Sequence, residues 1–203
     1  GQALCRSYNN WMAEVCGRRP DNFKWVAAVT LDDVHGAVVE AGRAKALGAV
    51  GLMVCGTYGE RLLGSPEFLP FFAEAARLDL SIGVHVGWTC TAVNQLVTDL
   101  FNSTVTAFAF PVLASFVSLI GAGIFDRFPT LRIAFLETGC EWVPYLASRM
   151  NHFYDFAVEQ RIHMDYFDRN HAFRTGSNRS KAYRTSAVRA RNSDLETPSA
   201  FNS

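Results

Sequence analysis

The sequence lacks the features that mark several common protein classes. Its 203 residues include five Cys and no CxxC pair, which argues against a disulfide scaffold and a zinc ribbon. Lys and Arg number 19, as do Asp and Glu, so no overall charge favours nucleic acid. The phosphate-binding patterns GxGxxG and GxxxxGKS/T follow none of its apolar runs. We therefore expect a cytoplasmic protein with reduced thiols and no nucleic acid partner.

Neither a secretory signal nor a clear membrane span is predicted. Residues 1–16 contain Arg6 and Glu14 and have no apolar core. Residues 107–125 form an uncharged run of 19, long enough to cross a bilayer. However, Pro111 lies early in this run, acidic residues flank it, and no Lys/Arg cluster orients it. A helix buried in a protein core is the favoured interpretation, and no membrane partner is expected.

Composition divides the chain into a folded part and a tail. Apolar residues make up 49% of the sequence, which is enough for a large core. Residues 171–203 hold six basic and two acidic side chains, a net charge of +4, and follow no helical or strand period. We expect one α/β domain over residues 1–165 and a disordered basic tail over residues 166–203.

Short apolar runs alternate with helical patterns along the expected domain. The predicted strands are residues 25–30, 49–55, 80–86 and 131–136. The predicted helices are residues 7–16, 32–47, 66–78, one or two within 91–125, and 142–158. Continuously apolar strands of this kind are typical of a parallel sheet buried on both faces. A closed barrel and an open doubly wound sheet both fit; the barrel is favoured because no nucleotide-binding loop is present.

Ligands of parallel α/β proteins bind at the carboxyl ends of the strands, which selects two main candidates. His85, in GVHVG, ends the third predicted strand and could act as a metal ligand or a general base. The alternative is a core histidine bonded to a carbonyl group. Glu137 follows LRIAF and could ligate a metal, take a proton or anchor a substrate. Its alternative is a salt bridge to Arg132 or Arg149.

The same rule predicts a cleft around these two groups. Because both follow strands of one parallel sheet, we expect His85 and Glu137 less than roughly 12 Å apart, about two and a half strand spacings. Trp88 would form one wall of the cleft, and Tyr58 would close the other side. Thr138, beside Glu137, is a further expected substrate contact.

Three segments resemble the amidohydrolase-2 family, which includes aminocarboxymuconate semialdehyde decarboxylase-like enzymes. The first reads YNNWMAEVCGRRPDNFKWVAAVTLDD, and the second GAVGLMVCGTYGERLLGSPEFLPFFAEAARLDLSIGVHVG. The third, IFDRFPTLRIAFLETGCEWVPYLASRM, is the most specific, because it matches the family pattern GVFDRFPxLKxxFxExGxxWxP closely. Together the segments cover about residues 7 to 155.

The resemblance implies a metal-dependent (β/α)8 barrel enzyme, a lyase (decarboxylase) or a hydrolase. Its substrate would be a small carboxylated or amide-bearing molecule. His85 would be the metal ligand from the fifth strand of the family. Glu137 would be catalytic, because it occupies the position where the family carries a proton-transferring His or a Glu. A complete chain would bind one divalent metal, expected to be zinc.

The sequence departs from this family at two metal-binding motifs. It contains no HxH pair and no GSDYP turn, so only His85 of the usual ligands is present. We therefore expect an incomplete, partial TIM-barrel-like member with four to five βα units and weak zinc binding. The alternative is a non-catalytic remnant that binds a small molecule or a partner through the same pocket. A homodimer is compatible with either.

Overall fold

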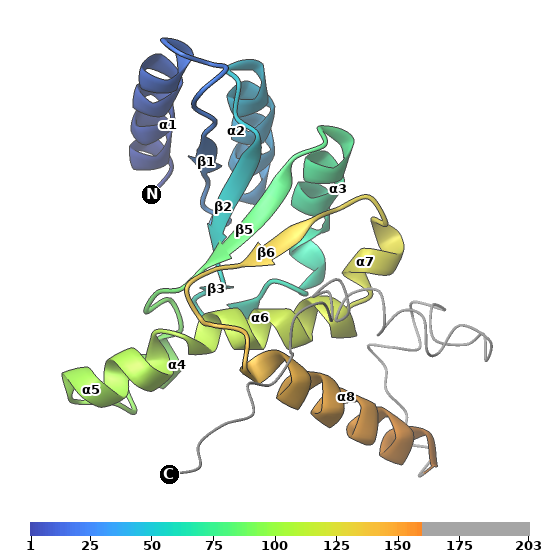
Figure 1. The fold of residues 1–203 in the computed structure, drawn as a ribbon. Helices are drawn as coiled ribbons and strands as arrows, with labels where there is room; N and C mark the ends of the chain where they lie inside the picture. The colour runs from blue at the N-terminus through green and yellow to red at the C-terminus, as the bar shows by residue number, and fades with distance from the viewer. Residues whose placement is uncertain (160–203) are drawn as a thin grey trace, which may run out of the picture.

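The computed structural model describes residues 1–159, which form a parallel sheet with helices packed on it (Figure 1). The expected end of the domain at residue 165 and the expected tail over residues 166–203 lie outside the described residues.

The sheet confirms the four predicted strands, each shorter than its apolar run. They are β1 (Val26–Ala28), β2 (Gly51–Cys55), β5 (Ser81–His85) and β6 (Ile133–Phe135), all parallel. Their spatial order, β1-β2-β5-β6, is also their order in the chain. A doubly wound sheet reverses its strand order at a switch point, so the described part of the chain favours the partial barrel.

The helices also follow the sequence pattern, except that residues 91–125 hold several short pieces besides α6 instead of one or two helices. The main ones are α1 (Gln2–Gly17), α2 (Val34–Ala46), α3 (Leu69–Arg77), α6 (Phe110–Gly121) and α8 (Trp142–Glu159). Shorter pieces are a 3-10 turn (Pro66–Phe68), α4 (Thr91–Asn94), α5 (Leu100–Asn102), a π-helical turn (Ser103–Ala107) and α7 (Ile124–Arg127). The first helix begins earlier than predicted. Residues 56–65, which lie between a predicted strand and a predicted helix, contain the hairpin β3 (Thr57–Tyr58) and β4 (Arg61–Leu62).

Alternate residues of each strand lie on opposite faces of the sheet. Leu52, Val54, Ile82 and Val84 are fully buried or nearly so and belong to the hydrophobic core. Met53, paired with Gly83, is only partly buried, and Ala134 on β6 is exposed. Figure 1 shows α1, α2 and α3 beside the strands and α6 and α8 beyond their carboxyl ends. Within residues 1–159, therefore, one face is packed against helices and the other is open.

The apolar run beyond residue 100 packs on the domain along part of its length, with 39% of its most apolar window buried. By length and composition, residues Leu100–Gly121 could cross a membrane, with a mean hydropathy of 1.9. Within it, α6 buries Val112, Ser115, Phe116 and Leu119. The Ser115 hydroxyl donates a hydrogen bond to the carbonyl of Gly56, and the Gly64 N–H donates one to Ser118 Oγ at 2.8 Å. These contacts join α6 to the β3–β4 hairpin.

Candidate active site

His85 lies at the carboxyl end of β5, where its Cα pairs with Cys55 of β2. Its Nδ1 is 3.0 Å from the carbonyl oxygen of Val86. Because a carbonyl can only accept, this contact assigns the hydrogen to Nδ1 and leaves Nε2 facing outward. The backbone hydrogen bond of the alternative interpretation is therefore present, yet it orients the ring rather than using up both nitrogens.

Glu137 reaches this free nitrogen. Its Oε1 lies 3.4 Å from His85 Nε2. Glu137 has a left-handed backbone with φ of 63°, unusual for a residue with a side chain. The structure thus confirms that the two groups converge at one edge of the sheet. The salt bridge considered with Arg132 does not form, since Arg132 donates to Asp79 Oδ1 at 2.8 Å.

The two atoms that face each other, His85 Nε2 and Glu137 Oε1, are both hydrogen-bond acceptors. With its hydrogen on Nδ1, Nε2 offers a lone pair, and an ionised carboxylate oxygen offers only lone pairs. Two acceptors at 3.4 Å repel each other unless a proton or a cation lies between them. The pair therefore brings a nitrogen lone pair and a carboxylate oxygen close enough to share a proton or a positive ion.

Trp88 is fixed beside this end of β5. Its Nε1–H donates to Ser103 Oγ at 2.7 Å, and its ring lies 4.6 Å from that of Phe108. Ser103 begins the π-helical turn, a form of helix found frequently at functional sites. Half of the Trp88 side chain stays exposed, which is compatible with the predicted wall of a cleft.

Tyr58 occupies a supporting position. It is buried, and its hydroxyl accepts from the Cys55 N–H at 3.1 Å and donates to the Val29 carbonyl at 3.4 Å. Burial raises the pKa of Tyr58 far above its usual value. The hydroxyl thus joins the ends of β1 and β2 rather than facing an open cleft. A direct contact with substrate stays a prediction.

Thr138 lies in the turn after β6, directly after Glu137. Its Oγ1 is buried and has no hydrogen-bond partner within the described residues. Its carbonyl accepts from Trp142 Nε1 at 3.0 Å, which ties the turn after β6 to the start of α8. A buried hydroxyl without a partner is uncommon in folded proteins, and this one lies next to Glu137.

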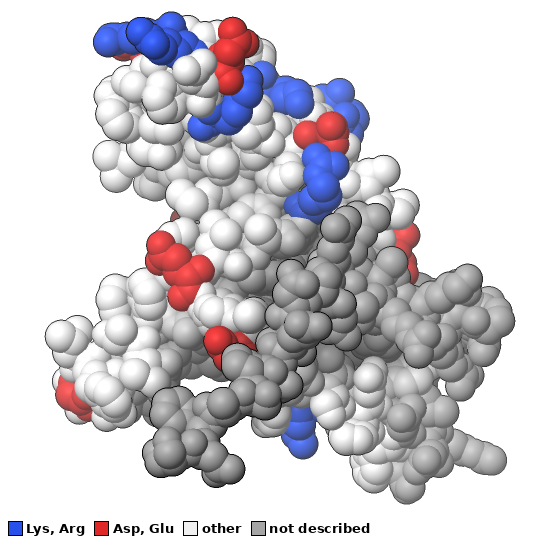
Figure 2. Space-filling model, in the orientation of Figure 1, with Lys and Arg blue, Asp and Glu red and all other residues white. Residues whose placement is uncertain are grey.

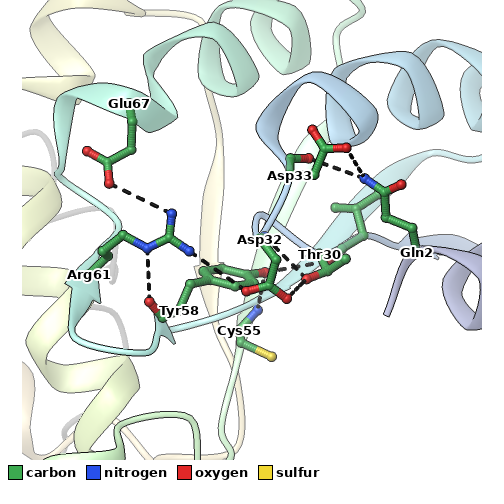
Figure 3. A network of polar contacts seen from close by, with 9 residues as sticks. Gln2, Thr30, Asp32, Asp33, Cys55, Tyr58, Arg61 and Glu67 are labelled. Carbon is green, nitrogen blue, oxygen red and sulfur yellow. Dashed lines mark hydrogen bonds and ion pairs between the residues drawn. The ribbon is translucent and has the colours of Figure 1, made fainter.

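Sequence reasoning missed a second polar cluster, which Figure 3 shows. Arg61 donates from Nε to the Tyr58 carbonyl at 3.2 Å, and its other nitrogens lie 3.8 Å from Asp32 and 3.9 Å from Glu67. Thr30 Oγ1 donates to Asp32 Oδ2 at 2.7 Å. The position of these residues in the sequence could have indicated the cluster, because Asp32 follows β1 and Arg61 follows β2 in the chain.

A cavity of about 480 Å³ lies between α1, α2 and the end of β1, apart from the His85–Glu137 pair. Its lining mixes apolar residues with polar ones, among them Gln2, Arg6, Thr30, His35 and Glu40. No sequence motif indicated it, because its walls come from three separate elements.

The described residues do not complete a metal centre by themselves. His85 Nε2 and Glu137 Oε1 are two suitable donors, but residues 1–159 contain no group of three or more His, Cys, Asp or Glu that could hold an ion. Catalytic zinc sites generally use three protein ligands. His163 and His171 lie outside the described residues. The expected weakness of zinc binding stays a prediction.

A parallel sheet whose strands follow chain order is the arrangement of a partial α/β barrel, and the His85–Glu137 pair lies at its carboxyl edge, where barrel enzymes hold their active sites. A comparison with known protein families supports the partial barrel. The Amidohydrolase family model matches residues 1–191, so this chain belongs to that family, as the sequence resemblance implied.

Individual relatives extend this comparison. The chain is 29% identical over 191 residues to gamma-resorcylate decarboxylase of Rhizobium sp. (strain MTP-10005), covering 86% of this chain and 58% of that protein. The solved 2,6-dihydroxybenzoate decarboxylase from Rhizobium matches with a TM-score of 0.64 and 27% identity, over 73% of this chain and 48% of that one.

A third similarity concerns the fold alone. The 5-carboxyvanillate decarboxylase of Novosphingobium aromaticivorans, solved in complex with manganese, has a TM-score of 0.69 and 23% identity, over 80% of this chain and 47% of that one. The chain thus spans about half the length of the solved relatives it matches.

Proposed function

We propose that this chain carries part of a decarboxylase active site for a small aromatic carboxylic acid, with His85 and Glu137 as the proton-handling pair. The observation that carries the proposal is the 3.4 Å approach of His85 Nε2 to Glu137 Oε1 at the carboxyl ends of two adjacent parallel strands. The named relatives, which are decarboxylases of carboxylated phenols, support this choice over hydrolysis.

Decarboxylation requires a proton to be delivered to the ring carbon that loses the carboxylate. Decarboxylation breaks the bond between the ring carbon and the carboxylate, releases CO₂ and leaves an electron pair on that carbon. A proton from the His85–Glu137 pair then forms the new C–H bond, and solvent returns a proton to the pair. A general acid in this position contributes about 10²- to 10⁴-fold in rate.

Two neighbours provide contacts for such a substrate. The exposed half of the Trp88 indole, held by Ser103 and Phe108, offers a flat apolar surface on which an aromatic ring can stack. If its side chain turns outward, the unpartnered Thr138 hydroxyl can pair with a phenol or carboxylate oxygen. Tyr58 supports the strand ends behind them.

No step is assigned to a metal. The described residues supply two donors, whereas a catalytic ion generally has three protein ligands. Weak zinc binding is therefore the expected result. This incomplete set specifically favours a second candidate function, a non-catalytic site that binds an aromatic acid. A cytoplasmic location is proposed with either function.

Turnover of 2,6-dihydroxybenzoate by the full chain, followed as CO₂ release with and without Mn²⁺, separates these functions. We expect Glu137→Gln and His85→Asn to lower the rate about 10²-fold or more. Arg132→Gln is the control, because Arg132 bonds to Asp79 and Ser81 instead of the pair. Saturable binding without turnover, weakened by Glu137→Gln, supports the non-catalytic site. Turnover that neither variant changes contradicts the proposal.

A further inference from the structure

The segment that follows β5 carries Trp88 and is bonded on two sides. Residues 86–94, here called the Trp88 loop, bring the indole to the end of β5. On one side, Trp88 bonds to Ser103, and the Gly87 N–H donates to the Phe108 carbonyl at 3.1 Å. On the other side the Trp88 loop meets the β3–β4 hairpin, for which the proposed function has no role.

The hairpin holds the Trp88 loop at two points. Thr57, which is buried, shares a 2.8 Å hydrogen bond between its hydroxyl and that of Thr89. Glu60 lies in the turn between β3 and β4, where its Oε1 accepts from the Ala92 N–H at 3.1 Å. Its second carboxylate oxygen accepts from the Cys90 thiol at 3.7 Å. One carboxylate of the hairpin therefore bonds to two neighbouring positions of the Trp88 loop.

The bond from Ala92 caps the helix α4. This helix has four residues, and its N-cap residue, Cys90, makes no side-chain capping bond. The first N–H groups of a helix have no partner within it, and a single helical turn is unfavourable to nucleate. The Glu60 carboxylate supplies the missing acceptor, together with a negative charge at the positive end of the turn.

The sequence around α4 offers no other carboxylate for this position. Residues 86–108 contain a single charged side chain, Asp99, which caps α5 by accepting from the Asn102 N–H at 2.9 Å. Figure 2 shows few charged side chains over α4 and α5 on the face drawn. The charge that stabilises α4 therefore comes from the hairpin.

The other end of α4 is bonded to Trp88 itself. Asn94, the last residue of α4, donates from Nδ2 to the Trp88 carbonyl at 2.9 Å. Within residues 1–159 the Asn94 Oδ1 is buried without a partner. The bond to Trp88 is therefore the contact that fixes this amide.

We propose that Glu60 is a positioning residue for Trp88. It caps α4, α4 places Asn94, and Asn94 holds the Trp88 backbone while Ser103 holds the indole. Without the cap, the turn would unwind and the indole would lose one of its two supports. The consequence for substrate rests on the proposed function, whereas the consequence for Trp88 does not.

The indole N–H of Trp88 gives a direct readout in the full chain. Trp88→Phe identifies its signal among the four Trp indoles in a ¹⁵N-resolved NMR spectrum. We expect Glu60→Ala to shift and broaden this signal. Glu60→Gln keeps a side-chain oxygen for the Ala92 N–H and should leave the signal near its wild-type position. Glu67→Ala is the matched control, since Glu67 is an exposed carboxylate that pairs with Arg61 instead of the Trp88 loop.

Binding of 2,6-dihydroxybenzoate gives the functional readout. We expect Glu60→Ala to raise KM, or Kd where turnover is absent, about fivefold to tenfold, the loss expected for a displaced aromatic contact. Stacking is present in both the ground state and the transition state, so kcat should change by less than about twofold. Glu60→Gln should restore the affinity, because it restores the cap.

Asn94→Asp tests the last link without altering the hairpin. A carboxylate cannot donate to the Trp88 carbonyl, so this variant should move the same indole signal. Combining it with Glu60→Ala should add little, because both changes act through one bond. Circular dichroism checks that each variant folds. Should Glu60→Ala fail to fold, Asn94→Asp and Glu60→Gln provide the comparison.

Three results would overturn the proposal. They are an unchanged Trp88 signal in Glu60→Ala, a loss in Glu60→Gln as large as in Glu60→Ala, and full additivity with Asn94→Asp. The first would mean that Ser103 and Phe108 alone hold the indole. A Trp88 signal that shifts as expected, with no effect on 2,6-dihydroxybenzoate or no binding of it, would count against the proposed function alone.

Discussion

At the scale of single residues, Glu137 combines backbone strain with a functional position. Its φ of 63° lies in the left-handed region, and its carboxylate faces His85. Such a conformation costs about 1 kcal/mol or more for a residue with a side chain. The strain lets the chain turn sharply after β6 while the side chain points back to the end of β5.

Replacing Glu137 by Gly should therefore stabilise the protein while removing the acid. We expect Glu137→Gly to raise the free energy of unfolding by about 1 kcal/mol relative to Glu137→Ala, because only Gly adopts the left-handed backbone without strain. Urea denaturation measures the difference. Both variants lack the carboxylate, so equal stability of the two would show that the turn is not strained.

Asn9 is the most heavily bonded buried polar side chain that the structure describes. Fully buried on α1, it pairs with both backbone groups of Ala28 and donates to Glu40 Oε1 at 2.8 Å. One amide thus joins α1, β1 and α2. It also satisfies the edge of β1, which would otherwise carry unpaired groups.

Truncation of Asn9 should be far more costly than truncation of its neighbour. We expect Asn9→Ala to lower the free energy of unfolding by about 3 kcal/mol, because buried partners lose their hydrogen bonds. Asn10→Ala removes one exposed bond from Arg43 and should cost less than about 1 kcal/mol. Chemical denaturation compares the two, and similar losses would argue against the bridging role.

At the scale of elements, α6 depends on glycine for its close approach to the β3–β4 hairpin. A Cβ at Gly56 would overlap the carbonyl of Pro111, and one at Gly64 would overlap the carbonyl of Ser118. Both obstacles are backbone atoms, which cannot rotate away as a side chain can. The two glycines therefore set the distance between hairpin and helix.

Substitution at these glycines tests the packing. Gly56→Ala should lower the free energy of unfolding by at least about 2 kcal/mol, as overpacking a fixed backbone does. Gly17→Ala is the control, since nothing lies within 4 Å of its added Cβ, and it should change stability by less than about 1 kcal/mol. Thermal and urea unfolding of both variants provide the comparison. Near-wild-type stability of Gly56→Ala would mean that the hairpin shifts freely.

At the scale of the whole molecule, acid sensitivity follows from a few bonded carboxylates. Burial acts to raise the pKa of Glu40, but hydrogen bonds from Arg43 and Asn9 outweigh it and hold that pKa below its usual value. The Gly36 N–H and then Gln2 lower the pKa of Asp33, which caps α2. Each group takes up its proton at a higher pH in the unfolded chain than in the folded one.

The stability that these groups contribute is thus present above their ordinary pKa and is lost as pH falls through the lowered value. We expect constant stability down to about pH 5 and a decline below about pH 4.5. Glu40→Gln should flatten that decline and lower stability near neutral pH. Urea titrations across this range measure the slope. A slope unchanged in Glu40→Gln would contradict this account.

The amino-acid sequence by itself determined the strands, the parallel class and the edge that holds the site. Apolar runs select buried strands locally, and the strand-end rule then placed His85 and Glu137 together. The specific block around FDRFPTLRIAFLETG indicated the family, which the comparison confirmed.

Only the tertiary structure decided the rest, because it depends on contacts between distant segments. The β3–β4 hairpin exists where α6 packs against a stretch that looks like a loop. Tyr58 turns its hydroxyl inward because Val29 and Cys55 offer partners from two strands. Asn9 becomes a strand cap only after α1 is seated beside β1. No local pattern records such pairings, since each depends on which elements become neighbours.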